Sequence, residues 1–210
     1  SHLLARPAVR SNLNYYILEL SEILDNYTGQ SARLLPLVFY QDCSLVDIQL
    51  YNPSNNNKLI FSAIFNDEYA LLLNGKSDTL YSLNRHVLSL DDSKSAIDYL
   101  RFFCSYVQSE YGPFQIITHL DEIPFKDEGM DQNIRDTIKA SIHNPEYLEG
   151  SFERDGWQAF KACVLYGGAL FSSVMRVFSN GRVSLEEDRA IADNLLLLQR
   201  QYHGIFRTPL

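Results

Sequence analysis

Phe160–Val183, with the sequence FKACVLYGGALFSSVMRVFSNGRV, has the clearest pattern in this chain. Within Phe160–Tyr166 the set Phe160, Ala162, Val164 and Tyr166 alternates with the set Lys161, Cys163 and Leu165. This period of two residues is that of a β-strand, whose successive side chains point to opposite faces. The pairs Gly167-Gly168 and Asn180-Gly181 favour two-residue hairpin turns, because the central positions of such turns take positive φ. The segment therefore predicts an antiparallel strand over residues 169–179 with a tight turn at each end.

Further strands are predicted on the N-terminal side of this hairpin. In Leu45–Tyr51 apolar and polar residues alternate, as they do in a half-buried strand. Asn74-Gly75 favours a turn that would pair the strands on either side of it. The expected strands in this region are Leu45–Tyr51, Lys58–Phe65, Tyr69–Asn74, Thr79–Leu83 and Phe114–Leu120.

Helices are predicted from apolar spacings of three and four residues and from capping residues. Asp91-Asp92-Ser93 offers an N-cap for a helix that runs to about Glu110, with acidic residues near the positive end of the helix dipole. Ser184 with Glu187 three residues later has the sequence of a capping box, which predicts a last helix. The expected helices are 12–27, 93–110, 132–142 and 185–201. The residues expected to be buried on the last helix are Ile191, Leu195 and Leu198.

These elements define the expected fold class. Tight turns join antiparallel strands, and the helices interrupt them without a βαβ alternation. We therefore expect an α+β fold, with an antiparallel meander of about six to seven strands and three to four helices packed mainly on one face. Residues 1–210 are expected to form a single domain, and the loop-rich segment 121–150 is the best place for a subdivision.

Composition limits the class of protein. The chain has 210 residues, of which 46% are hydrophobic and 12% aromatic, and this excludes a disordered chain. No stretch approaches the 18 apolar residues of a membrane-spanning helix, and we expect no signal segment, because no charged-then-apolar stretch stands at the start of the sequence. Three cysteines (Cys43, Cys104 and Cys163) form no CxxC pair, which indicates reduced thiols and a cytoplasmic protein.

The charge of the chain is acidic and uneven. The formal net charge is −8, and an excess of acidic residues argues against nucleic acid and against an anionic membrane surface as partners. Residues 121–155 contain ten acidic and four basic side chains. This acidic segment is either a solvated surface or a docking face for a basic protein partner.

The candidate site is the string His119-Leu120-Asp121-Glu122, at the end of a predicted strand. On a strand His119 and Asp121 would point to the same face, and an imidazole beside a carboxylate can act as a general base or as a pair of metal ligands. His86 is a further catalytic candidate, and Arg85 and Tyr81 are candidates for binding a substrate. The pattern names neither a third metal ligand nor a cofactor.

No sequence motif of a known catalytic class is present. The chain has no GxSxG elbow, no phosphate-binding glycine loop and no zinc-binding spacing. We therefore expect a non-enzymatic binding or interaction protein that acts through a sheet face or the acidic segment, with a protein partner or a homodimer. The alternatives are a hydrolase that uses His119 with Asp121, and a carrier of a small apolar ligand beneath the 12–27 helix.

Overall fold

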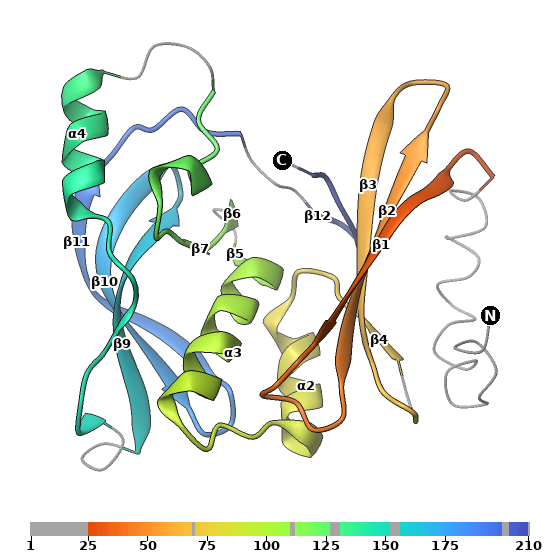
Figure 1. Ribbon diagram of the computed structural model, residues 1–210, viewed down its shortest axis with the longest axis horizontal. Coiled ribbons are helices and arrows are strands. Elements are labelled where there is room, and N and C mark those ends of the chain that lie inside the picture. Colours follow the sequence, from red (N-terminus) through yellow and green to blue (C-terminus); the bar gives the residue numbers. More distant parts are fainter. Residues whose placement is uncertain are drawn as a thin grey trace. The chain divides into compact units, whose positions relative to one another are not determined.

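The computed structural model describes residues 25–68, 70–109, 112–126, 131–151, 156–198 and 202–209 (Figure 1). Contacts divide the chain into two compact units. The first unit contains residues 1–74 and 202–209, and the second contains residues 75–201 with Leu210. The acidic segment 121–150 lies inside the second unit. That the two units act as one domain stays a prediction.

The fold class is confirmed as α+β with antiparallel sheets. In the described part of the chain the strands form a six-stranded sheet, a five-stranded sheet and a two-stranded ribbon, and every pair of strands between named elements is antiparallel. The described helices are α2 (Ser77–Val87), α3 (Ser93–Tyr106) and α4 (Gln132–Ser141), with a 3₁₀ turn η1 (Leu120–Glu122).

The first unit is built on one antiparallel sheet, in the order β1-β2-β3-β13-β12 with β4 also paired to β3. Its strands are β1 (Thr28–Pro36), β2 (Ser44–Asn52), β3 (Asn57–Phe65), β4 (Ala70–Leu72), β12 (Tyr202–His203) and β13 (Phe206–Arg207). β2 and β3 are joined by a polar turn over residues 53–56. β13 brings the end of the chain back to this sheet, where Phe206 pairs with Phe61.

β1 is not among the strands that the sequence predicts. All nine of its residues are exposed, so no alternation of apolar and polar residues marks it in the sequence. It is held by its backbone ladder with β2, in which Arg33 pairs with Asp47. Most of the predicted 12–27 helix lies outside the described residues, and the chain forms a turn at Asp25-Asn26 before β1 begins.

The second unit contains a sheet in the order β11-β10-β9-β7, with β8 also paired to β9. Its strands are β7 (Gln115–Ile116), β8 (Glu146–Tyr147), β9 (Trp157–Tyr166), β10 (Ala169–Phe178) and β11 (Val183–Ala192), and the ribbon pairs β5 (Gln108–Ser109) with β6 (Gly112–Pro113). The two predicted glycine turns are confirmed. Gly167 and Gly168 have φ of 58° and 82°, and Gly181 has φ of 78°.

Two predicted elements are wrong, and in both a local signal is overridden. Thr79–Leu83 lies within α2 and is not a strand, because Leu80, Leu83 and Asn84 form one buried face at helical spacing. No hairpin forms at Asn74-Gly75, because the chain enters α2 at Ser77. The carbonyl of Gly75 instead accepts the N–H of Gln108. This helix separates the strands into two sheets where a single meander was expected.

The predicted last helix is instead the strand β11. The tight turn at Asn180-Gly181 places Val183 opposite Val177, and the ladder with β10 then continues to Ala192. The Ser184 hydroxyl donates to Glu186 and does not cap a helix. Of the side chains expected to be buried, Leu195 is buried and Leu198 is 49% exposed. Backbone pairing with the neighbouring strand β10 therefore outweighs the capping sequence.

The helix predicted after the Asp92 cap is confirmed as α3, but it ends at Tyr106, and Gln108–Ser109, which were expected to be helical, form β5. The Asp92 side chain accepts the N–H of Ser95 at 2.6 Å, and the Ser95 hydroxyl lies 3.2 Å from the N–H of Asp92, which completes a capping box. Tyr99 and Leu100 are fully buried, as is Cys104 at 2% exposure. Burial raises the pKa of the Cys104 thiol to about 12, so it remains protonated and behaves as a core residue.

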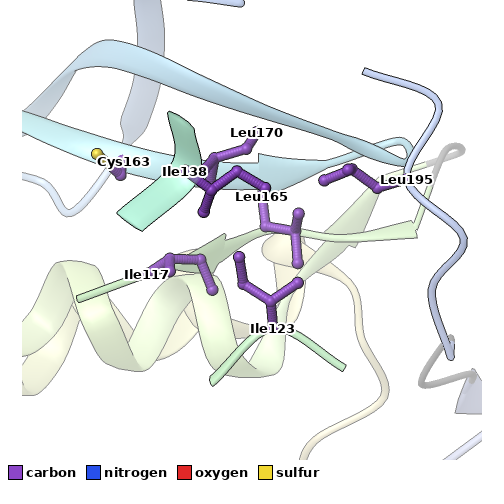
Figure 2. Packing of buried hydrophobic residues seen from close by; sticks show 7 residues of the cluster. All are labelled: Ile117, Ile123, Ile138, Cys163, Leu165, Leu170 and Leu195. Carbon is purple, nitrogen blue, oxygen red and sulfur yellow. The ribbon is translucent and has the colours of Figure 1, made fainter. Parts of the chain in front are cut away.

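One hydrophobic cluster of the second unit lies between the β9–β10 hairpin, α4 and the segment that follows β7. Figure 2 shows side chains from these three parts directed toward one another. The buried cluster consists of Ile117, Ile123, Ile138, Cys163, Leu165, Leu170 and Leu195. All three cysteines of the chain are buried free thiols, as the sequence indicated for Cys104 and Cys163.

A buried polar link fastens the β10–β11 turn to two helices. The Tyr99 hydroxyl donates to the carbonyl of Gly181 at 2.7 Å, and the Asn84 amide donates to the Tyr99 oxygen at 2.8 Å. The same amide group lies 3.3 Å from the carbonyl of Asn180. A Cβ atom built on Gly181 would lie 2.8 Å from Leu88 and from the Tyr99 hydroxyl, so only glycine fits this position.

We expect Gly181→Ala to lower the free energy of unfolding by about 2–5 kcal/mol, because positive φ and a steric clash act together. Gly150→Ala is the matched control, since Gly150 also has positive φ but a Cβ there meets nothing within 4 Å. The control should lose only about 1–2 kcal/mol. Urea denaturation measures both values, and equal losses would show that the close contact with the helices has no energetic weight.

Candidate functional site

His119 lies in a turn and not on a strand. β7 ends at Ile116, Ile117 is buried in the core, and η1 begins at Leu120. His119 precedes η1 with extended backbone angles (φ −137°, ψ 150°), and both it and Asp121 are exposed. The predicted period of two residues therefore does not apply, because the chain leaves the strand conformation before Asp121.

The carboxylate of Glu122 holds this turn together. Its Oε2 atom accepts the backbone N–H of Thr118 at 2.6 Å and that of His119 at 3.1 Å. The Thr118 hydroxyl donates to Oε1 at 3.0 Å. Partial burial opposes ionisation, but these donors and the charge of His119 together hold the pKa of Glu122 below its ordinary value. Glu122, which lies in the candidate string but was given no role there, is thus an ionised positioning residue.

The signal for Glu122 is present in the sequence. In a capping box, the glutamate at the third position of a helical turn accepts a hydrogen bond from the backbone N–H of the N-cap residue, which stands just before the turn. Here His119 and Glu122 have this spacing. An extended strand, as expected for this string, would not bring the Glu122 carboxylate back to the His119 backbone.

Two surface hollows share Thr118 and His119. The first, of about 440 Å³, lies toward α3 and is lined by Arg101, Ser105, Gln115, Ile116, Thr118, His119 and Glu122. The second, of about 490 Å³, lies toward α4 and is lined by Thr118, His119, Leu120, Asp121, Ile123, Phe125, Arg135, Lys139 and Ile142. We call the second the α4 hollow. The rigid turn therefore presents His119 to both spaces, and presents Asp121 only to the α4 hollow.

The α4 hollow combines an apolar base with a charged rim. Ile123 is 4% exposed and belongs to the core cluster, and Phe125 and Ile142 pack against that cluster. Arg135 and Lys139 come from α4, and the Arg135 guanidinium lies 5.9 Å from the centroid of the Phe125 ring. Such a site can hold an apolar group while charged side chains contact a polar end.

The other predicted site residues lie elsewhere in the second unit. Arg85 and His86 are exposed in the last turn of α2, where their positive charge complements the helix dipole. Tyr81 stacks on Phe103 with ring centroids 6.0 Å apart. Burial raises the pKa of Tyr81, against the opposing effect of a hydrogen bond from the backbone of Val183. None of these three residues lines either hollow.

The catalytic roles of His119, Asp121 and His86 stay predictions. No hydrogen bond or ion pair between His119 and Asp121 is found in the described part of the chain. Within the same residues, no group of three His, Cys, Asp or Glu side chains could hold a metal ion. The one well-connected carboxylate of the turn, that of Glu122, is fixed as an acceptor by backbone donors.

A second candidate surface is the edge strand β1 of the first unit. Within the described residues β1 pairs with β2 alone, and all nine of its residues are exposed. Leu34 is 62% exposed and Val38, two residues beyond the strand, is 70% exposed. The charge of Arg33 is matched by Asp47, whose Oδ2 atom lies 2.8 Å from the guanidinium.

Asp47 joins this edge to the middle of the sheet. Its Oδ1 atom accepts the Ser62 hydroxyl at 2.6 Å and lies 3.0 Å from the guanidinium of Arg207. Arg207 is 5% exposed. One carboxylate on β2 therefore contacts side chains from β1, β3 and β13, which fixes the edge strand to a rigid sheet.

Comparison with known proteins finds no matching family model, no matching curated protein and no matching solved structure. No helix in the described residues has both the length and the apolar character needed to cross a membrane. The function must therefore be inferred from the two surfaces themselves.

We expect Glu122→Gln to destabilise the protein at neutral pH and to do so less at acid pH. Because folding lowers the pKa of Glu122 from 4.5, its stabilising effect is present above that pH and is lost as the pH falls through the folded value. The free energy of unfolding of both proteins is measured by urea denaturation from neutral pH to below pH 4.5. Glu149→Gln, at an exposed position, is the control, and a pH-independent deficit in Glu122→Gln would contradict the expectation.

Proposed function

We propose that this chain is an interaction protein that pairs through the edge strand β1, and that its partner is a second copy of the chain. The observation that carries the proposal is a nine-residue strand, exposed along its whole length, at the edge of a regular sheet. An edge strand presents backbone N–H and C=O groups that a further strand can pair with.

Charge favours self-pairing at this edge. Arg33 is the only charged residue of β1, and it is already matched by Asp47. The sequence of the first unit contributes only two of the eight net negative charges of the chain. Two copies that meet at β1 therefore avoid most of the repulsion that their net charge would cause elsewhere.

The regular half of β1 is self-complementary. The register between β1 and β2 is irregular between Gly29 and Ser31, and is continuous from there to Pro36. An antiparallel pair centred on Leu34 would place Leu34 of each copy opposite its equivalent and Arg33 opposite Leu35. Apolar side chains then meet at the two-fold axis, and no like charges stand opposite each other.

The rival functions stay predictions. A hydrolase requires His119 and Asp121 to act together, and both side chains are exposed in a turn. The apolar carrier was expected to bind its ligand beneath the 12–27 helix, most of which lies outside the described residues. The acidic segment as a docking face has no further support, whereas the β1 edge has exposure, register and charge in its favour.

We expect the protein to be a dimer at about 100 µM, and Leu34→Lys to be a monomer at that concentration, because two lysines would face each other at the axis. The measurement is light scattering coupled to size-exclusion chromatography. Leu196→Lys is the matched control, since Leu196 is a similarly exposed leucine in the second unit, at 64% against 62%. It should leave the dimer intact.

Two results would contradict the proposal. One is a wild-type protein that is monomeric at this concentration, and the other is a Leu34→Lys variant that remains dimeric. Circular dichroism of Leu34→Lys checks that the sheet is retained.

A further inference from the structure

The rim of the α4 hollow is positively charged, and the proposed function does not use this feature. The sequence of the second unit carries six of the eight net negative charges of the chain. At the rim of the α4 hollow the balance is reversed, because two cations, Arg135 and Lys139, face it with a single carboxylate, Asp121. A cationic rim in an acidic unit is selective for an anionic ligand by charge complementarity.

Arg135 and Lys139 are arranged to act together. They are four residues apart on α4, so their side chains lie on the same face of the helix. The acidic neighbours on this helix are engaged elsewhere. Asp131 accepts the N–H of Asn133 at 2.8 Å, and Asp136 accepts from the amide of Gln132 at 2.9 Å. Among the described residues, neither cation takes part in an ion pair.

The base of the α4 hollow is apolar and fixed. Ile123 and Ile138 are buried in the same core cluster, and Phe125 and Ile142 pack against it. The backbone of Phe125 is held by its N–H to the carbonyl of Ile123 at 2.8 Å, and Lys126 donates to the carbonyl of Leu196 at 2.9 Å. An apolar group seated here would meet a preformed surface, which reduces the entropy cost of binding.

From these observations we propose that the α4 hollow binds a small organic anion in which an acid group is attached to an apolar chain or ring. The apolar part would lie on Ile123, Phe125 and Ile142, and the acid group would contact Arg135 and Lys139. The volume of about 490 Å³ suits a ligand of this size. The proposal concerns the second unit and does not depend on pairing through β1.

The test uses octanoate as the probe. Acetate is the control for the carboxylate without the long chain, and octanol is the control for the chain without the charge. Two-dimensional NMR of the ¹⁵N-labelled full chain follows the titration. We expect saturable shifts at the amides of residues 119–123 and 135–142, with a dissociation constant of about 1 mM, which is ordinary for a ligand of ten non-hydrogen atoms. Acetate and octanol should each bind at least several-fold more weakly.

Three substitutions separate the contributions at the rim. Arg135→Gln and Lys139→Gln should each weaken octanoate binding by about two- to five-fold, the range of an exposed charge pair. Asp121→Asn should strengthen it by about two-fold, because it removes the one like charge. Lys94→Gln, at an exposed position on α3, is the matched control and should not change the dissociation constant.

Absence of saturable shifts in the wild-type protein would overturn the proposal. So would an octanol affinity equal to that of octanoate, since the cations would then have no role. Unchanged binding by the Arg135→Gln/Lys139→Gln double variant would also overturn it. Spectra of the variants without ligand show that the fold is retained, and Leu34→Lys should bind octanoate normally whatever its oligomeric state.

Discussion

The structure of the second unit depends on a buried hydrogen-bonded link between a hairpin turn and two helices. The Tyr99 hydroxyl is bonded to the carbonyl of Gly181 and to the amide of Asn84, and both side chains are buried. Buried polar atoms without partners are costly, so each member of this link fixes the others. α3, which carries Tyr99, also contacts β7 and β9. The position of the turn after β7, and of the two hollows beside it, is therefore set by packing far from His119 in sequence.

Capping residues and glycine pairs predicted the elements whose structure depends only on neighbouring residues in the sequence. Asp92 caps α3, and Gly167-Gly168 makes the β9–β10 turn, because each needs only its immediate neighbours to act. The strand β11 could not be predicted, since it depends on a ladder with β10 that opposes the capping sequence at Ser184. β1 could not be predicted either, because its sequence has no pattern of burial. It buries no side chain, so nothing in its sequence records the backbone pairing that makes it a strand.

The candidate site shows the same division between local and distant information. The sequence directed attention to His119 and Asp121, and both line the α4 hollow. It did not indicate Arg135 or Lys139, because they come from a helix that a core contact through Ile138 brings to the turn. The capping role of Glu122 was visible in the spacing but required knowing that the strand ends early. A site assembled from two elements is predictable only after their packing is known.

The two surfaces differ in the physical forces that each can use. The β1 edge offers backbone hydrogen bonds and a few exposed leucines with its one charge matched, which suits strand pairing and makes binding insensitive to salt. The α4 hollow offers a small apolar base and two cations at the surface, so an anion bound there would be released as ionic strength rises. The two surfaces belong to separate compact units, so both can be followed in the same sample. Added salt should weaken anion binding at the α4 hollow and leave pairing through β1 unchanged. Strand pairing should persist under conditions that empty the hollow.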